Sequence, residues 1–261
     1  MNKNIYIIAN WKMNPLDAKR AKLLFDTVKK GIKKTGNTEV VICPPFLYCP
    51  LFSVSRFLKL GAQDCFWEKQ GAYTGEVSAG MLKDLGCEYV IIGHSERRLH
   101  FKETDEVVNK KVKAVLEARL KPVLCVGEQV RDAFDPSGRI INEMSLAVGE
   151  QLKKNLDGIG ANKLREIIIA YEPIWAIGSG NPCLPDDAMK ARLFIKKTLV
   201  NLYERQTAEK IKILYGGSID SQNAVKYVDQ ADIDGLLVGG ASLNASEFIR
   251  IVKSVEGIDR A

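Results

Sequence analysis

Glu172 has the side chain and the surroundings of a general base. It follows an apolar run and precedes Ile174-Trp175-Ala176-Ile177-Gly178-Ser179-Gly180. A carboxylate among such neighbours is partly desolvated, which makes it a stronger base. An isolated glutamate is more often an exposed surface residue. The segment that follows favours the base, because an apolar stretch with a central tryptophan and terminal glycines suits a loop that closes over a ligand.

An imidazole and an ammonium group stand at comparable positions. His94 lies in the expected strand-to-helix turn Gly93-His94-Ser95-Glu96-Arg97-Arg98. A helix N-terminus disfavours the imidazolium and leaves a neutral ring that can donate a hydrogen bond to a substrate oxygen. Lys12 ends the first apolar run beside Trp11, where its charge could pair with a phosphate. A structural histidine and a solvated surface lysine are the alternatives.

Two glycine pairs, Gly216-Gly217 and Gly239-Gly240, follow two later apolar runs. Without a Cβ atom, backbone N–H groups can approach an anion and point at it together, as in a phosphate cradle. Either pair alone could simply turn the chain. Two pairs at the ends of successive runs favour phosphate binding.

The elements that must position these residues alternate along the chain. Short β-branched runs alternate with longer amphipathic stretches, which is typical of repeated βα units around a parallel sheet. The predicted strands are Ile5–Ala9, Val40–Cys43, Lys59–Ala62, Tyr89–Gly93, Lys121–Val126, Ile167–Tyr171, Ile211–Tyr215 and Gly235–Val238. The predicted helices include Asp17–Lys34, Thr104–Ala118, Asn142–Leu156, Asp186–Glu204 and Ala245–Val255, with Asp17, Thr104 and Asp186 as helix starts.

Eight units in about 250 residues predict a single (β/α)₈ TIM barrel that forms one domain over residues 1–261. A doubly wound open sheet is the main alternative. After the first run, however, the chain has Asn10-Trp11-Lys12-Met13-Asn14 in place of a glycine-rich dinucleotide-binding turn. In a parallel barrel the active site lies at the C-terminal ends of the strands. The sequence therefore predicts that Asn10, Lys12, His94, Glu172 and the glycine pairs meet at one end of the barrel.

Composition restricts the partners. The net charge is +6, but the charged residues are interspersed, so no basic tail for nucleic acid or membrane is expected. There is no apolar run of about 18 residues and no signal-peptide pattern, which predicts a soluble, cytoplasmic protein. The six cysteines form no C-x-x-C pair, and the chain has two histidines. Reduced structural thiols are expected, with no metal site.

Seven segments of the chain resemble triosephosphate isomerase, in that family's order, from residue 5 to about residue 250. They are Asn10-Trp11-Lys12-Met13-Asn14, Gly71-Ala72-Tyr73-Thr74-Gly75-Glu76, Gly93-His94-Ser95-Glu96-Arg97-Arg98, Cys125-Val126-Gly127-Glu128, the stretch from Ala170 to Gly180, Tyr215-Gly216-Gly217-Ser218 and Val238-Gly239-Gly240-Ala241-Ser242-Leu243. The segments around His94 and Glu172 are specific to the family, whereas the glycine pairs alone are not.

The resemblance implies interconversion of dihydroxyacetone phosphate and D-glyceraldehyde 3-phosphate, as in glycolysis and gluconeogenesis, by proton transfer through an enediolate and without a cofactor. It implies that Glu172 is the base and that His94 is the neutral electrophile, a pairing for which this family is the standard example. Asn10 would assist His94. Lys12 would offset the charge of the phosphate and the enediolate, with Glu96 as its partner.

The same resemblance assigns phosphate binding to the backbone N–H groups of Gly178, Ser218, Gly239 and Gly240. It makes the segment from Pro173 to about Cys183 a closing lid, with Ile177 and Leu237 pressing against the base. It also implies a homodimer in which the loop that carries Thr74 reaches the neighbouring subunit.

Two departures from the family pattern stand out. Asp64 follows Gly-Ala-Gln where the family usually has Asn, and Asn181-Pro182-Cys183 ends the expected lid where Lys and small or β-branched residues are commoner. Neither departure touches a residue assigned to the chemistry. Another phosphate-binding (β/α)₈ enzyme and a non-catalytic phosphate-binding barrel are the alternative functions.

Overall fold

A closed, all-parallel barrel of eight strands forms the centre of the computed structural model, which describes residues 4–33, 35–131, 133–134, 140–141, 143–177, 183–256 and 258. The strands are β1 (Ile5–Asn10), β2 (Thr38–Cys43), β3 (Leu58–Ala62), β4 (Cys87–Ile92), β5 (Lys121–Val126), β8 (Ile168–Tyr171), β9 (Lys212–Tyr215) and β10 (Gly235–Val238). They are hydrogen-bonded in the order β1-β10-β9-β8-β5-β4-β3-β2, and the first and last strands pair to close the barrel. The predicted (β/α)₈ architecture is confirmed.

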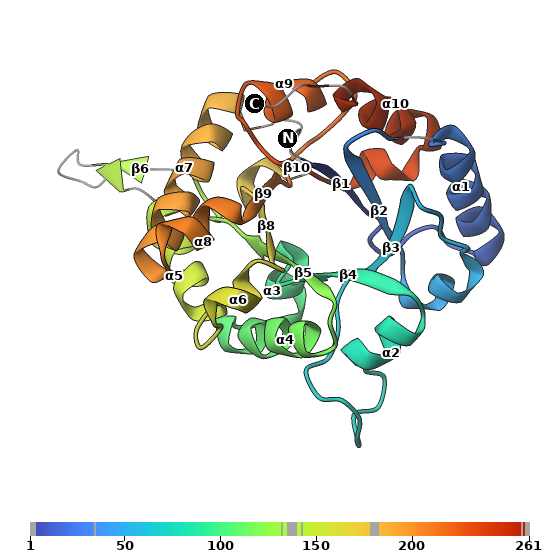
Figure 1. The fold of residues 1–261 in the computed structure, drawn as a ribbon, viewed down its shortest axis with the longest axis horizontal. Coiled ribbons are helices and arrows are strands. Elements are labelled where there is room, and N and C mark those ends of the chain that lie inside the picture. Colours follow the sequence, from blue (N-terminus) through green and yellow to red (C-terminus); the bar gives the residue numbers. More distant parts are fainter. Residues whose placement is uncertain are drawn as a thin grey trace.

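The helices surround this barrel, as Figure 1 shows in a view close to the barrel axis. They are α1 (Ala18–Gly31), α2 (Ala79–Asp84), α3 (Ser95–Phe101), α4 (Asp105–Glu117), α5 (Glu143–Asn155), α6 (Ala161–Leu164), α7 (Pro185–Leu202), α8 (Arg205–Lys210), α9 (Ala224–Asp229) and α10 (Ala245–Val255). The described residues also form the 3₁₀ turns η1 (Phe46–Leu51), η2 (Ile174–Ala176) and η3 (Gly240–Leu243), and β6 (Ala133–Phe134) and β7 (Ile140–Ile141) form a separate antiparallel pair.

Apolar side chains fill two layers because successive residues of a strand face opposite sides of the sheet. Ile7 of β1 packs in the larger cluster between barrel and helices, together with Phe25 of α1. Ile8, the next residue, lies in the smaller cluster with Tyr89 and Leu214 from other strands. The strands are thus buried on both faces, which explains their continuous apolar runs in the sequence.

Helix starts agree with the sequence only in part. Asp17 and Thr104 are N-caps, and each side chain accepts a hydrogen bond from a first-turn N–H group. The expected start at Asp186 is wrong: α7 begins one residue earlier, with Pro185 in its first turn and Leu184 as the capping residue. Proline suits that position because its missing N–H group would have no partner there.

Among the described residues, no helix combines the length and the apolar character that spanning a bilayer requires. Within the same residues, no group of three or more His, Cys, Asp or Glu side chains is arranged to hold a metal ion.

Candidate active site

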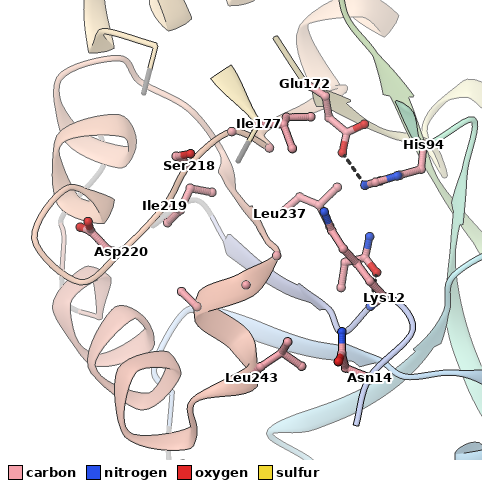
Figure 2. Close-up of a pocket in the computed structure, with 16 residues that line it drawn as sticks. Lys12, Asn14, His94, Glu172, Ile177, Ser218, Ile219, Asp220, Leu237 and Leu243 are labelled. Carbon is pink, nitrogen blue, oxygen red and sulfur yellow. Dashed lines mark hydrogen bonds and ion pairs between the residues drawn. The ribbon is translucent and has the colours of Figure 1, made fainter. Parts of the chain in front are cut away.

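A cavity of about 440 Å³ opens at the C-terminal ends of the strands and collects residues that are far apart in the sequence. Asn10 is the last residue of β1 and Lys12 follows it, His94 follows β4, Glu172 follows β8, and the two glycine pairs follow β9 and β10. Figure 2 shows Lys12, His94 and Glu172 directed toward the same space. The structure therefore brings together the strand-end residues that the sequence singled out.

Glu172 and His94 form the buried, polar end of this cavity. The Nε2 atom of His94 lies 3.2 Å from Oε1 of Glu172, and both side chains are almost fully buried. The other carboxylate oxygen, Oε2, accepts a hydrogen bond of 3.2 Å from the backbone N–H of Ser95, the first residue of α3. The helix N-terminus thus holds a carboxylate in place where its partial positive charge favours an anion.

The tautomer of His94 follows from its role as the N-cap of α3. Its Nδ1 atom accepts a hydrogen bond of 3.2 Å from the backbone N–H of Glu96, so Nδ1 carries no proton. The proton of a neutral ring is then on Nε2, the atom that faces the cavity and Glu172. This arrangement places a hydrogen-bond donor at the point where a substrate oxygen could lie.

Lys12 adopts a left-handed backbone conformation, with φ of 53°, which is uncommon for a residue other than glycine. Side chains hold it there: Asn10 Oδ1 accepts from the Lys12 N–H at 3.0 Å, and Gln63 Nε2 donates to the Lys12 carbonyl at 2.8 Å. Gln63 also donates to the carbonyl of Cys43 at 2.9 Å. Sequence reasoning gave Gln63 no role, although it directly follows β3 and the strand-end rule applied to β3 would have found it.

The ammonium group of Lys12 is paired with a carboxylate. Its Nζ atom lies 2.7 Å from Oε1 of Glu96, and both side chains are only partly exposed. The stem of Lys12 passes Gly239, where an added Cβ would lie 3.5 Å from Lys12 Cε. Lys12 therefore lies between the acid–base end of the cavity and its glycine-rich end.

The glycine-rich end is lined by Ser218, Gly239 and Gly240. A Cβ atom at Gly216 would stand 2.9 Å from Cγ of Glu172, so the absence of a side chain there leaves room for the carboxylate. The hydroxyl of Ser218 donates to the carbonyl of Ala176 in η2 at 3.0 Å. Gly178, the fourth residue expected at the phosphate, lies outside the described residues.

Ile177 and Leu237 line the same cavity as Glu172, and Figure 2 shows Ile177 beside the carboxylate. The expected lid can be followed from Pro173 to Ile177 and again at Cys183, whereas Asn181 and Pro182 lie outside the described residues.

Glu128 holds the start of this segment: its Oε1 atom accepts hydrogen bonds from Tyr171 Oη at 2.8 Å and from Trp175 Nε1, in η2, at 2.7 Å. Burial and this carboxylate raise the pKa of Tyr171, so the phenol stays protonated and remains a donor to Glu128.

A second group of buried charges, here called the Asp64 cluster, consists of Asp64, Arg97, Glu103 and Lys111. The Nζ atom of Lys111 lies 2.8 and 2.7 Å from the two oxygens of Asp64 and 2.5 Å from Glu103. Arg97 Nε lies 2.8 Å from Asp64 and 2.5 Å from Glu103. Desolvation, only partly offset by Lys111, raises the pKa of Asp64 to about 6. The departure at Asp64 is therefore a buried carboxylate held by two cations.

Thr74 does not join the cavity. It is exposed on the connection between β3 and α2, which extends away from the barrel in Figure 1.

Several large apolar side chains are exposed on segments that follow the neighbouring strands β1 to β4. They are Met13, Leu16, Leu47, Met81, Leu99 and Phe101.

Comparison with known proteins matches almost the whole chain to one family. The model of the family described as triosephosphate isomerase matches residues 5–255. A triosephosphate isomerase from Dictyoglomus turgidum is 44% identical over 255 residues, covering 95% of this chain and 98% of the relative. One from Moorella thermoacetica is 45% identical over 249 residues, covering 94% of this chain and 96% of the relative. One from Alkaliphilus oremlandii is 44% identical over 249 residues, covering 94% and 97%.

Proposed function

The chain belongs to the triosephosphate isomerase family, and from that premise we propose how its residues interconvert dihydroxyacetone phosphate and D-glyceraldehyde 3-phosphate. One observation carries the proposal. A carboxylate and an imidazole 3.2 Å apart share a cavity of about 440 Å³ with a lysine and two glycine-rich turns. A proton can be moved at one end of such a cavity while a phosphate is held at the other.

In the proposed mechanism Glu172 removes a proton from one carbon of the substrate and returns it to the neighbouring carbon. The electron pair left on that carbon moves toward the carbonyl oxygen and gives an enediolate. Nε2–H of His94 donates a hydrogen bond to this oxygen, assisted by Asn10, and His94 passes the proton of the neighbouring hydroxyl to it, so that the neighbouring oxygen becomes the new carbonyl. A preorganised donor at the developing charge lowers the barrier more than it stabilises the bound ketone or aldehyde.

Phosphate binding is assigned to Lys12 and to the backbone N–H groups of Ser218, Gly239, Gly240 and Gly178. The positive charge of Lys12 lies between the two ends of the cavity, so it can offset both the phosphate and the enediolate. Glu96, at 2.7 Å from Lys12 Nζ, orients the ammonium group and does not itself contact substrate.

Exclusion of water is assigned to the segment from Pro173 to about Cys183. Ile177 and Leu237, which line the cavity with Glu172, would press against the base when this segment covers the substrate. An enediolate in contact with water can expel its phosphate, and a dry site suppresses that side reaction.

The test is a coupled isomerase assay in both directions with a metal chelator present. Because the proposed base and electrophile are side chains, activity should be unaffected by the chelator. Loss of activity on chelation would contradict the proposal. A protein that binds phosphate but does not isomerise triose phosphates would also contradict it. Either result would favour another phosphate-binding barrel. We place this activity in the cytoplasm, where a glycolytic enzyme meets its substrates.

We also propose that the chain forms a homodimer through the apolar side chains after β1 to β4, with the Thr74 loop reaching the other subunit. Met13 is 91% exposed and Phe101 66% exposed, and burial of such side chains against a second copy favours association. Replacement of residues 70–76 by a short polar turn should give monomers of low activity. A fully active monomer, shown by light scattering at assay concentration, would rule out a shared site.

A further inference from the structure

Tyr227 is a buried residue of α9 whose hydroxyl holds the backbone of Cys183. Its Oη atom donates a hydrogen bond of 2.6 Å to the Cys183 carbonyl. The N–H of the same residue donates to Oη of Tyr215 at 3.2 Å. Two tyrosine hydroxyls thus hold Cys183, which lies two residues before the start of α7 at Pro185.

The two tyrosines also hold each other. Their rings stack with centroids 4.0 Å apart and planes at 21°. Burial raises the pKa of Tyr215, and the neighbouring Tyr227 raises it further, so the Tyr215 phenol stays protonated. The stacked pair and its two hydrogen bonds to Cys183 therefore link α9, the end of β9 and the residue that precedes α7 by two positions.

The phenol of Tyr215 packs against the glycine-rich turn of the cavity. A Cβ atom at Gly217 would stand 2.0 Å from the Tyr215 hydroxyl, so the turn rests on the phenol. Gly216, Gly217 and Ser218 line the cavity. A displacement of the Tyr215 ring would therefore move the backbone N–H groups that face the proposed phosphate.

We propose that Tyr227 is a positioning residue for phosphate binding: through Tyr215 it fixes the turn at Gly216–Ser218, and through Cys183 it fixes the end of the segment that follows the base. This inference rests on the proposed function for the identity of the phosphate site. Tyr227 does not line the cavity, and its effect is transmitted through Tyr215 and Cys183.

The test is Tyr227→Phe, which removes one hydroxyl and leaves the stacked ring in place. Tyr203→Phe is the matched control, because Tyr203 also donates to backbone carbonyls, those of Leu156 at 3.1 Å and Ile159 at 3.0 Å, but it lies directly after α7 and does not line the cavity. Steady-state kinetics on triose phosphates, thermal unfolding, and the dissociation constant for inorganic phosphate are measured for wild type and both variants.

Loss of one buried hydrogen bond predicts that Tyr227→Phe raises KM and the phosphate dissociation constant about 3- to 10-fold. The value of kcat should stay within about two-fold, because binding of a remote phosphate is the same in ground and transition states. Tyr203→Phe should lower the melting temperature comparably and leave both constants unchanged. Constants within two-fold of wild type for Tyr227→Phe, or equal changes in the two variants, would overturn the inference.

The two proposals fail separately. If wild type binds phosphate but does not isomerise triose phosphates, the proposed function is wrong. The dissociation constants for inorganic phosphate of wild type and Tyr227→Phe then still test the role of Tyr227. If wild type is active and Tyr227→Phe binds phosphate as wild type does, only the inference about Tyr227 is wrong.

Discussion

Two groups of buried charge lie close together in this chain and differ in what surrounds them. In the site, Glu172 and His94 share a 3.2 Å contact and face a cavity of about 440 Å³. In the Asp64 cluster, two carboxylates and two cations face one another and line none of the described cavities as a group. The sequence links the two groups, because Arg97 of the cluster directly follows Glu96 of the site.

The difference shows why buried charge alone does not identify an active site. In the Asp64 cluster the charges satisfy one another, and such a network ties together the connection after β3, α3 and α4. In the site, His94 and Lys12 have donors directed toward space that a substrate can fill. We therefore expect substitutions in the Asp64 cluster to change stability, and substitutions in the site to change activity.

The largest effect is expected for Lys111→Met. Lys111 bonds both Asp64 and Glu103 and is 3% exposed, so its loss leaves two buried carboxylates with one cation. Breaking such a network should cost about 3–5 kcal/mol of unfolding free energy, measured by urea denaturation. Lys110→Met is the control, because Lys110 is the exposed neighbour on the same helix. Similar losses in both variants would contradict the assigned role of the cluster.

Lys12→Met should give the opposite pattern. Removal of the charge that offsets phosphate and enediolate is expected to lower kcat/KM about 10²–10³-fold. The unfolding free energy should change little, because Lys12 pairs with the partly exposed Glu96 and such pairs contribute about 0–1 kcal/mol. A variant that loses stability in proportion to activity would remove the contrast between the two groups.

Asp64→Asn tests the pH dependence of the Asp64 cluster. Folding raises the pKa of Asp64 from 3.8 to about 6, so between these values the folded state binds more protons than the unfolded state. The unfolding free energy of wild type relative to Asp64→Asn should therefore fall as the pH rises from 4 to 6, and then level off. The total change is at most about 3 kcal/mol. Parallel stability curves for the two proteins between pH 4.5 and 7.5 would contradict this.

The smallest effect is expected for Gln63→Leu. The substitution removes the donor to the Lys12 carbonyl, and the left-handed backbone of Lys12 loses one of its two side-chain restraints. Loss of a hydrogen bond of about 1 kcal/mol predicts a 3- to 10-fold lower kcat/KM. Unchanged kcat/KM would show that Asn10 alone holds Lys12.

The sequence predicted the barrel and the strand-end residues because both depend on local patterns. Apolar runs mark strands, and parallel strands place the residues after them at one end, so His94 and Glu172 could be assigned to one site from 78 positions apart. The left-handed Lys12 and its restraint by Gln63 could not be predicted, because they depend on contacts between β1 and β3. The Asp64 cluster also escaped prediction, since it depends on contacts between the connection after β3 and the distant α3–α4 region. The start of α7 differs from the prediction because Pro185, whose missing N–H group costs nothing in a first turn, begins the helix before Asp186.

The most direct test of the proposed chemistry is kcat of Glu172→Asp, measured beside wild type with a chelator present and with circular dichroism to confirm the fold. The shorter side chain retracts the carboxylate by one methylene group, and proton transfer is sensitive to displacements of about 1 Å. Wild type should be fully active, and the variant should fold normally and lose about 10²-fold or more in kcat. A variant with the kcat of wild type would show that Glu172 is not the base.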